Sequence, residues 1–106
     1  MSYIGMDEKL LIKQCLQNNR KAQQELYNKY AKNMLGLCYR YTKSIQDAED
    51  VLQEGFIKVF TKLKQFDFKG EFGGWVRRVM ITTAINYLQQ QSKFNYEVEL
   101  ENRSEE

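Results

Sequence analysis

Apolar residues recur every three or four positions through most of the chain, which is the spacing of one face of an α-helix. The pattern predicts four helices, over residues 8–17, 19–43, 47–64 and 73–91. Asp7 is expected to cap the first, and Asn18 or Asn19 the second. The sequence of 106 residues contains no proline, so nothing forces these helices to break. We therefore predict one all-α domain, a compact bundle of about four helices with a loop before the last.

The third predicted helix contains the stretch DAEDVLQEGF and has two different sides. We expect Asp47 to be its N-cap, with Asp50 in the capping-box position. At about 100° per residue, the residues that converge on the apolar side are Ala48, Leu52, Gly55, Phe56, Val59 and Leu63. The opposite side presents Asp50, Gln53, Glu54 and Ile57. First-turn acids and a Glu54–Lys58 pair fit a solvated face, but Ile57 does not, so a solvated face and a partner surface both stay open.

The predicted loop over residues 65–74, within KQFDFKGEFGGW, is unusually aromatic. Phe72 leads into the next helix and is expected to enter the core. At least one of Phe66 and Phe68 is expected to stay available for stacking on a flat ligand. Lys64 and Lys69 flank these rings.

The fourth predicted helix is apolar on two nearly opposite sides, which is typical of a central helix. Between these sides runs a polar seam of Arg78, Thr82, Asn86 and Gln89, with Trp75 at its edge and Arg77 projecting elsewhere. A row of donors and acceptors on an otherwise apolar helix suits the recognition of nucleic acid.

Charge is segregated along the chain, although the formal net charge is only +2. Residues 58–93 hold seven basic and two acidic residues, whereas residues 47–54 hold four acids and no base. The first segment suggests an anionic partner such as nucleic acid, and the second suggests a basic partner.

Several classes of protein are not favoured by the composition. Histidine, the usual general base, is absent, and neither a nucleophile motif nor a glycine-rich phosphate loop is present. We therefore expect no enzyme and no cofactor. Cys15 and Cys38 lie within apolar patterns, which favours buried thiols over a disulfide or a metal site. No apolar run reaches the roughly 18–20 residues of a membrane span and the start lacks a signal-peptide core, so we expect a cytoplasmic protein.

Taken together, DAEDVLQEGFIKVF, the aromatic loop and WVRRVMITTAINYL resemble region 2 of bacterial sigma factors, specifically the extracytoplasmic-function (ECF) group. The resemblance covers about residues 8–93. It implies that Asp50, Gln53 and Glu54, with Ile57 beside them, dock on the clamp helices of the RNA polymerase β′ subunit. It also implies that loop 65–74 captures a base flipped from the non-template strand of the −10 promoter element. The residues implied for DNA binding are Phe66, Phe68, Lys69, Trp75, Arg77, Arg78, Thr82, Asn86 and Lys93.

The sequence departs from the family pattern at several places. Thr82 stands where asparagine is common, and the run Gln89–Gln91 stands where arginine is common. The second domain, region 4, which reads the −35 element, is absent, and residues 94–106 resemble the start of an acidic interdomain linker after a domain over residues 1–93. We therefore expect a part of a longer protein.

Two functions are compatible with the sequence. The first is a sigma-factor module that docks on core RNA polymerase and recognises and melts the −10 element, with an anti-sigma factor as a further partner. The alternative is a helical adaptor that binds proteins, without DNA binding.

Overall fold

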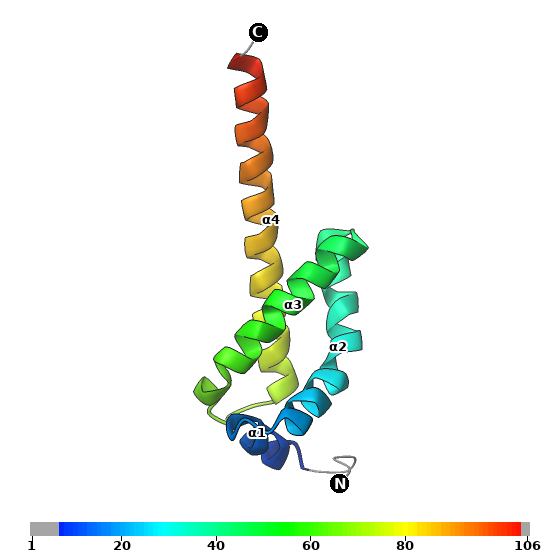
Figure 1. Ribbon diagram of the computed structural model, residues 1–106, viewed down its shortest axis with the longest axis vertical. Helices are drawn as coiled ribbons and strands as arrows, with labels where there is room; N and C mark the ends of the chain where they lie inside the picture. Colours follow the sequence, from blue (N-terminus) through cyan, green and yellow to red (C-terminus); the bar gives the residue numbers. More distant parts are fainter. Residues whose placement is uncertain (1–6, 105–106) are drawn as a thin grey trace.

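The computed structural model describes residues 7–104 and contains only helices and turns in that range, which confirms the all-α prediction (Figure 1). Four α-helices and one short 3₁₀ helix follow each other along the chain. They are α1 (Glu8–Leu16), α2 (Arg20–Thr42), α3 (Ile45–Thr61), η1 (Leu63–Gln65) and α4 (Phe72–Ser104).

The starts of the first two helices agree with the sequence. The Asp7 carboxylate accepts a hydrogen bond from the backbone N–H of Lys9 at 3.4 Å, and the Asn19 side chain accepts one from Ala22 at 3.1 Å. Asn18 adopts the left-handed conformation, with φ of 63°, which turns the chain between α1 and α2. Each cap satisfies a backbone donor that the first turn would otherwise leave unpaired.

The predicted start of α3 at Asp47 is wrong. Ser44 is the N-cap, because its hydroxyl accepts a hydrogen bond from the backbone N–H of Asp47 at 3.3 Å. The Asp47 carboxylate therefore does not cap the helix, and it accepts a hydrogen bond from the Tyr87 hydroxyl at 2.7 Å instead. A serine and an aspartate are both good caps, and only the backbone path after Lys43, with φ of 58°, decides between them.

The core lies between α2, α3 and the first half of α4, with α1 packed against α2. All the residues predicted for the apolar side of α3 are buried, and Val51 is buried with them. Gly55 permits the close approach of α3 and α4, because a Cβ atom there would lie 2.3 Å from Sδ of Met80. The absence of a side chain at this position therefore fixes how near the two helices come.

Helix α4 is much longer than predicted, since it continues past Gln91 to Ser104. Figure 1 shows its second half projecting alone beyond the other helices, in a molecule of 64 × 24 × 23 Å. On this half Phe94 and Tyr96 are 64% and 62% exposed. No glycine or proline follows Gly74, and residues 89–104 include three glutamines and three glutamates, so nothing in the sequence ends the helix where the packing stops. The packed core therefore ends well before the helix does.

Both cysteines are buried free thiols, as predicted, and burial raises the pKa of each to about 11. Among residues 7–104 no group of side chains is arranged to hold a metal ion. None of the helices in this range combines the length and the apolar character that crossing a membrane requires.

Candidate functional site

Helix α3 presents the acidic residues outward, as the sequence predicted. Asp50, Gln53 and Glu54 are exposed, and Ile57 is 61% exposed although it is aliphatic. Glu54 pairs with Lys58 at 3.6 Å, which is an ordinary i,i+4 contact of little energetic weight. The face therefore offers carboxylates and an amide around one apolar side chain.

An open groove of about 810 Å³ between α2 and α3 borders this face. Gln53 and Ile57 line it, together with the aromatic rings of Tyr27, Phe56 and Phe60. The rings of Tyr27 and Phe56 are 4.7 Å apart, and those of Phe56 and Phe60 are 6.2 Å apart. Periodicity within α3 identified the acidic face but missed this groove, because part of its wall (Gln23, Tyr27 and Leu35) comes from α2.

Asp47 and Tyr87 tie α3 to α4 at the edge of the acidic face. The hydrogen bond to the Asp47 carboxylate raises the pKa of the Tyr87 hydroxyl to about 12, since the bond requires the protonated phenol. This hydrogen bond links α3 to α4 at a point between the acidic face and the polar seam of α4.

In the loop before α4, one of the two phenylalanine side chains is buried and the other is partly exposed. Phe66 is only 9% exposed and packs against Phe68, Phe72 and Trp75, with ring centroids 5.1–5.7 Å apart. Phe68 is 37% exposed and has a φ of 62°, which directs the loop so that its ring lies at the surface. The ring of Phe68 is therefore the more accessible of the two, and Phe66 packs behind it while also lining the hollow beside Lys69.

One lysine side chain lies over the ring of Phe68, and a second lysine follows this residue in the loop. Lys69 follows it in the loop, and its backbone N–H donates to the Asp67 carboxylate at 3.0 Å, which stabilises the turn. Lys9 of α1 places its Nζ atom 5.5 Å from the centroid of the Phe68 ring. Sequence reasoning missed Lys9, because nothing in the local pattern shows that α1 packs beside this loop.

The polar seam of α4 lines a second groove, of about 350 Å³, between α4 and the end of α3. Trp75, Arg78, Thr82 and Asn86 come together there, as predicted from their spacing. Lys58 and Lys62 of α3 complete its wall and add two positive charges that were not assigned to the site from the sequence.

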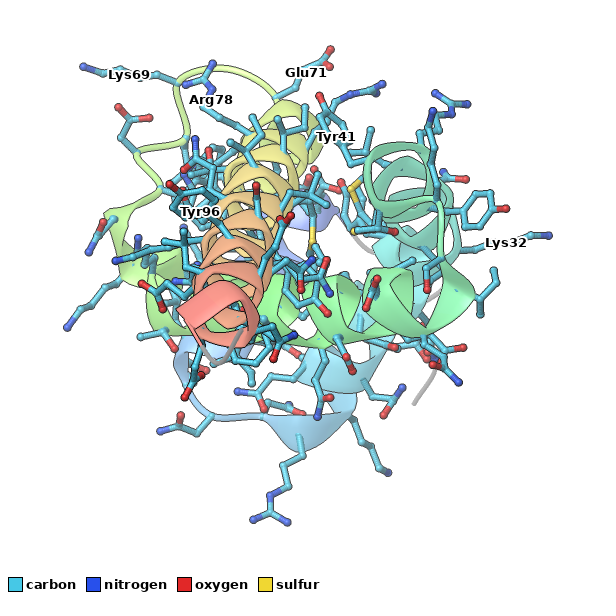
Figure 2. All side chains as sticks on the ribbon, turned by 90° about the horizontal axis from the view of Figure 1, so that it is seen from above. Lys32, Tyr41, Lys69, Glu71, Arg78 and Tyr96 are labelled. Atoms are coloured by element: carbon cyan, nitrogen blue, oxygen red, sulfur yellow. The ribbon has the colours of Figure 1, made fainter. Side chains whose placement is uncertain are left out.

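The loop and the seam are continuous. Lys69, Trp75 and Arg78 line a hollow of about 410 Å³ beside the loop. In Figure 2, Lys69 and Arg78 project from the same edge of the molecule.

Two predicted residues lie apart from this groove. Arg77 faces α2 instead, and lines a different groove with residues of that helix. Lys93 is exposed farther along α4, beyond the seam.

Comparison with known proteins agrees with this geometry. A family model described as Sigma-70 region 2 matches residues 26–94. The ECF RNA polymerase sigma-E factor of Haemophilus influenzae is 33% identical over 88 residues, which cover 83% of this chain and 46% of that protein. The RNA polymerase sigma-H factor of Pseudomonas aeruginosa is 36% identical over 78 residues, covering 74% of this chain and 40% of that protein. The chain thus spans about half the length of the curated relatives it matches.

A solved structure has the same fold. It is an NMR structure of an engineered region 2 of sigmaE in complex with GTAAAA, with a TM-score of 0.77 and 33% sequence identity. The match covers 88% of this chain and 96% of that one. The acidic face of α3, the aromatic loop and the seam of α4 therefore occur in a chain that belongs to the sigma-70 region 2 family, in the ECF group.

Proposed function

We propose that this chain is the part of a sigma factor that docks on core RNA polymerase and captures the −10 element of a promoter. The observation that carries the proposal is the continuous surface formed by the hollow beside Lys69 and the groove containing Trp75 and Arg78, together with the partly exposed ring of Phe68 in the same loop. This surface provides a stacking face, cations and a row of hydrogen-bonding groups in one place. An unstacked single strand needs all three.

Docking would use the acidic face of α3. Asp50 and Glu54 would form charge-assisted hydrogen bonds with basic residues of the polymerase clamp, the β′ clamp helices of the family. Ile57 would be the desolvated centre of the contact, and the groove lined by Phe60 would accept an apolar side chain beside it. The partner would thus be recognised by charge at the rim and by burial at the centre.

DNA capture would begin at the loop. Pulling a base out of the duplex stack costs a few kcal/mol, and stacking on the ring of Phe68 would offset about 1–3 kcal/mol of that. Lys69 and Arg78 would hold the phosphates on either side, while Thr82 and Asn86 offer hydrogen bonds to bases of the non-template strand. Trapping the unstacked base would stabilise the melted promoter DNA. The mechanism would therefore require binding but no chemical step.

These roles place the chain in the cytoplasm with the bacterial polymerase, acting without catalysis or a cofactor of its own. An anti-sigma factor that covers either surface would be its natural inhibitor.

Capture of purified bacterial core RNA polymerase by the immobilised chain tests the docking role. Glu54→Lys should abolish capture, because it places a cation against the basic partner, while the fold loses only about 0.3–0.5 kcal/mol from the Lys58 pair. Glu97→Lys, the same change at an exposed site on α4, is the matched control and should bind normally. Equal capture by both variants would refute the acidic face as the docking site.

A further inference from the structure

The backbone of Phe68 is in a conformation that an aromatic residue rarely adopts. Its φ of 62° lies in the left-handed region, where a bulky side chain crowds its own backbone. Such a conformation persists only where the surrounding contacts hold it in place. The residue is only 37% exposed although it projects from a loop, so neighbouring side chains cover much of it.

Two side chains pack against the ring of Phe68 and help to hold it in this conformation. The ring of Phe66, in the same loop, has its centroid 5.1 Å away. The Nζ atom of Lys9 lies over the ring, 5.5 Å from its centroid, within the range in which an ammonium is attracted to an aromatic face. Lys9 belongs to α1, so one of the two contacts comes from outside the loop.

Helix α1 is itself fixed beside the loop, at the end of the bundle where α4 begins (Figure 1). The Glu8 carboxylate accepts hydrogen bonds from Nζ of Lys29, at 2.6 Å, and from the hydroxyl of Tyr30. The Tyr30 ring packs edge-on against Phe72, with the two centroids 5.8 Å apart. These contacts tie the first turn of α1 to α2 and to the start of α4. The backbone of Lys9 is thus held in place, while its long side chain can still move.

The contact between Lys9 and the ring is weak enough to be exchanged for another. Lys9 has no ion-pair partner among residues 7–104, where the ion pairs are Lys29–Glu8 and Lys58–Glu54. An exposed cation–π contact contributes little, whereas a nucleic-acid base stacked on an aromatic ring is held more strongly. A base that reaches the Phe68 ring can therefore displace the ammonium.

The displaced ammonium has a place to go. Lys9 and Phe68 line one open cavity of about 530 Å³ between α1 and the loop. Two acidic residues, Asp7 and Glu71, line the same cavity. An ammonium that leaves the ring therefore finds negative charge within the cavity, which lowers the cost of its displacement.

We propose that Lys9 is a placeholder for the captured base. In the free protein its ammonium lies on the Phe68 ring and stabilises the left-handed conformation of that residue. The base takes over this position when the single strand binds, and the ammonium moves into the cavity between α1 and the loop. Lys9 is then a positioning residue, because it touches the ring and not the DNA. The inference rests on the proposed function, since it requires a base to stack on Phe68.

The first test follows the side-chain signals of Lys9 by NMR, with the hexamer GTAAAA of the similar solved structure as the probe. Protons over the face of an aromatic ring resonate at lower frequency than those of a free lysine. In the free protein the methylene protons next to Nζ of Lys9 should show this shift relative to Lys13, which is exposed on the same helix. Phe68→Leu should abolish the shift, and so should saturating hexamer. A shift that persists in the complex would overturn the proposal.

The second test measures the affinity for GTAAAA by fluorescence anisotropy at about 0.3 M salt, where exposed charges more than about 6 Å apart are largely screened. A contact that exists only in the free protein opposes binding, so its removal should tighten binding. Lys9→Ala should therefore bind the hexamer about two- to fivefold more tightly than the wild type. Lys13→Ala removes the same charge one turn along α1 and should show no gain. A damaged fold would not tighten binding, so misfolding cannot imitate the expected result.

The sign of this effect separates a placeholder from an ordinary DNA contact. Loss of a cation that binds a phosphate weakens binding and lowers the slope of log affinity against log salt by about 0.7. If Lys9→Ala weakens binding in this way, or if it matches Lys13→Ala, the proposal is wrong. In a Phe68→Leu background the gain from Lys9→Ala should vanish, and a gain that remains there would also contradict the proposal.

Failure of the proposed function looks different. If the wild type does not bind GTAAAA, or if Phe68→Leu binds it as tightly as the wild type, no base is captured on this ring. Base capture at the loop and the placeholder are then refuted together. If binding depends on Phe68 while Lys9 stays on the ring, only the placeholder is refuted.

Discussion

At the scale of single residues, Phe66 and Phe68 show how two similar side chains in one loop acquire different roles. The positive φ of Phe68 places its ring outside, while Phe66 fills the space between Phe72 and Trp75. The buried ring supports the exposed one, with their centroids 5.1 Å apart. Substitution of Phe68 should therefore mainly weaken DNA binding, whereas substitution of Phe66 should mainly lower the stability of the fold.

Phe68→Ala should weaken the binding of single-stranded DNA by about 1–3 kcal/mol, because it removes the stacking face. It should cost much less folding stability than Phe66→Ala does, since the ring of Phe68 is partly exposed. Phe66→Ala should cost about 3–5 kcal/mol of stability through the cavity it leaves. Urea denaturation and anisotropy of both variants check this pair, and a DNA-binding loss in Phe68→Ala that merely follows a loss of fold would contradict it.

At the scale of whole elements, α4 serves two purposes along its length. Up to about residue 88 it packs against α2 and α3 and carries the seam, and beyond that it is exposed. At about 1.5 Å per residue its 33 residues span roughly 50 Å, so a large part lies outside the bundle. That part continues the packed half of the helix, and no glycine or proline ends it.

Removal of residues 94–106 should therefore leave the free energy of unfolding of the domain within about 0.5 kcal/mol of the full chain. Circular dichroism should lose the signal of the removed helix, while urea denaturation should retain its midpoint. A loss of about 2 kcal/mol or more would mean that the projecting half of α4 belongs to the cooperative unit and that the predicted domain boundary near residue 93 is wrong.

At the scale of the molecule, features within one helix were predictable and features between helices were not. The apolar side of α3 and the seam from Trp75 to Asn86 follow from a period of 3.6 residues, and both occur as predicted. Lys9 and Lys62 are brought to the candidate surfaces by packing between elements, which no local pattern records. The start of α3 was missed for a different reason, because serine and aspartate are both favoured N-cap residues and only the turn before them selects one.

The response of the whole molecule to pH follows from its titratable groups. The chain has no histidine, so no side chain has an ordinary pKa between about 5 and 8, and stability should change little across that range. Above it, the groups whose pKa is raised by folding are the buried thiols of Cys15 and Cys38, at about 11, and the hydroxyls of Tyr30 and Tyr87. Each is held in its protonated form by burial, by a carboxylate partner, or by both.

A group with a raised pKa contributes its full stabilisation below the pKa of the unfolded chain and loses it as pH rises through the folded value. For the thiols this window runs from about 9 to 11, and for Tyr87 from about 10 to 12. The thermal midpoint should therefore be flat from pH 6 to about 8.5 and should fall steadily above pH 9. Tyr87→Phe, which removes the hydroxyl bound to Asp47, should be less stable at neutral pH but should lose less on going from pH 9 to 12. An identical alkaline decline in this variant and the wild type would mean that the contact between α3 and α4 at Asp47 contributes nothing to the pH dependence.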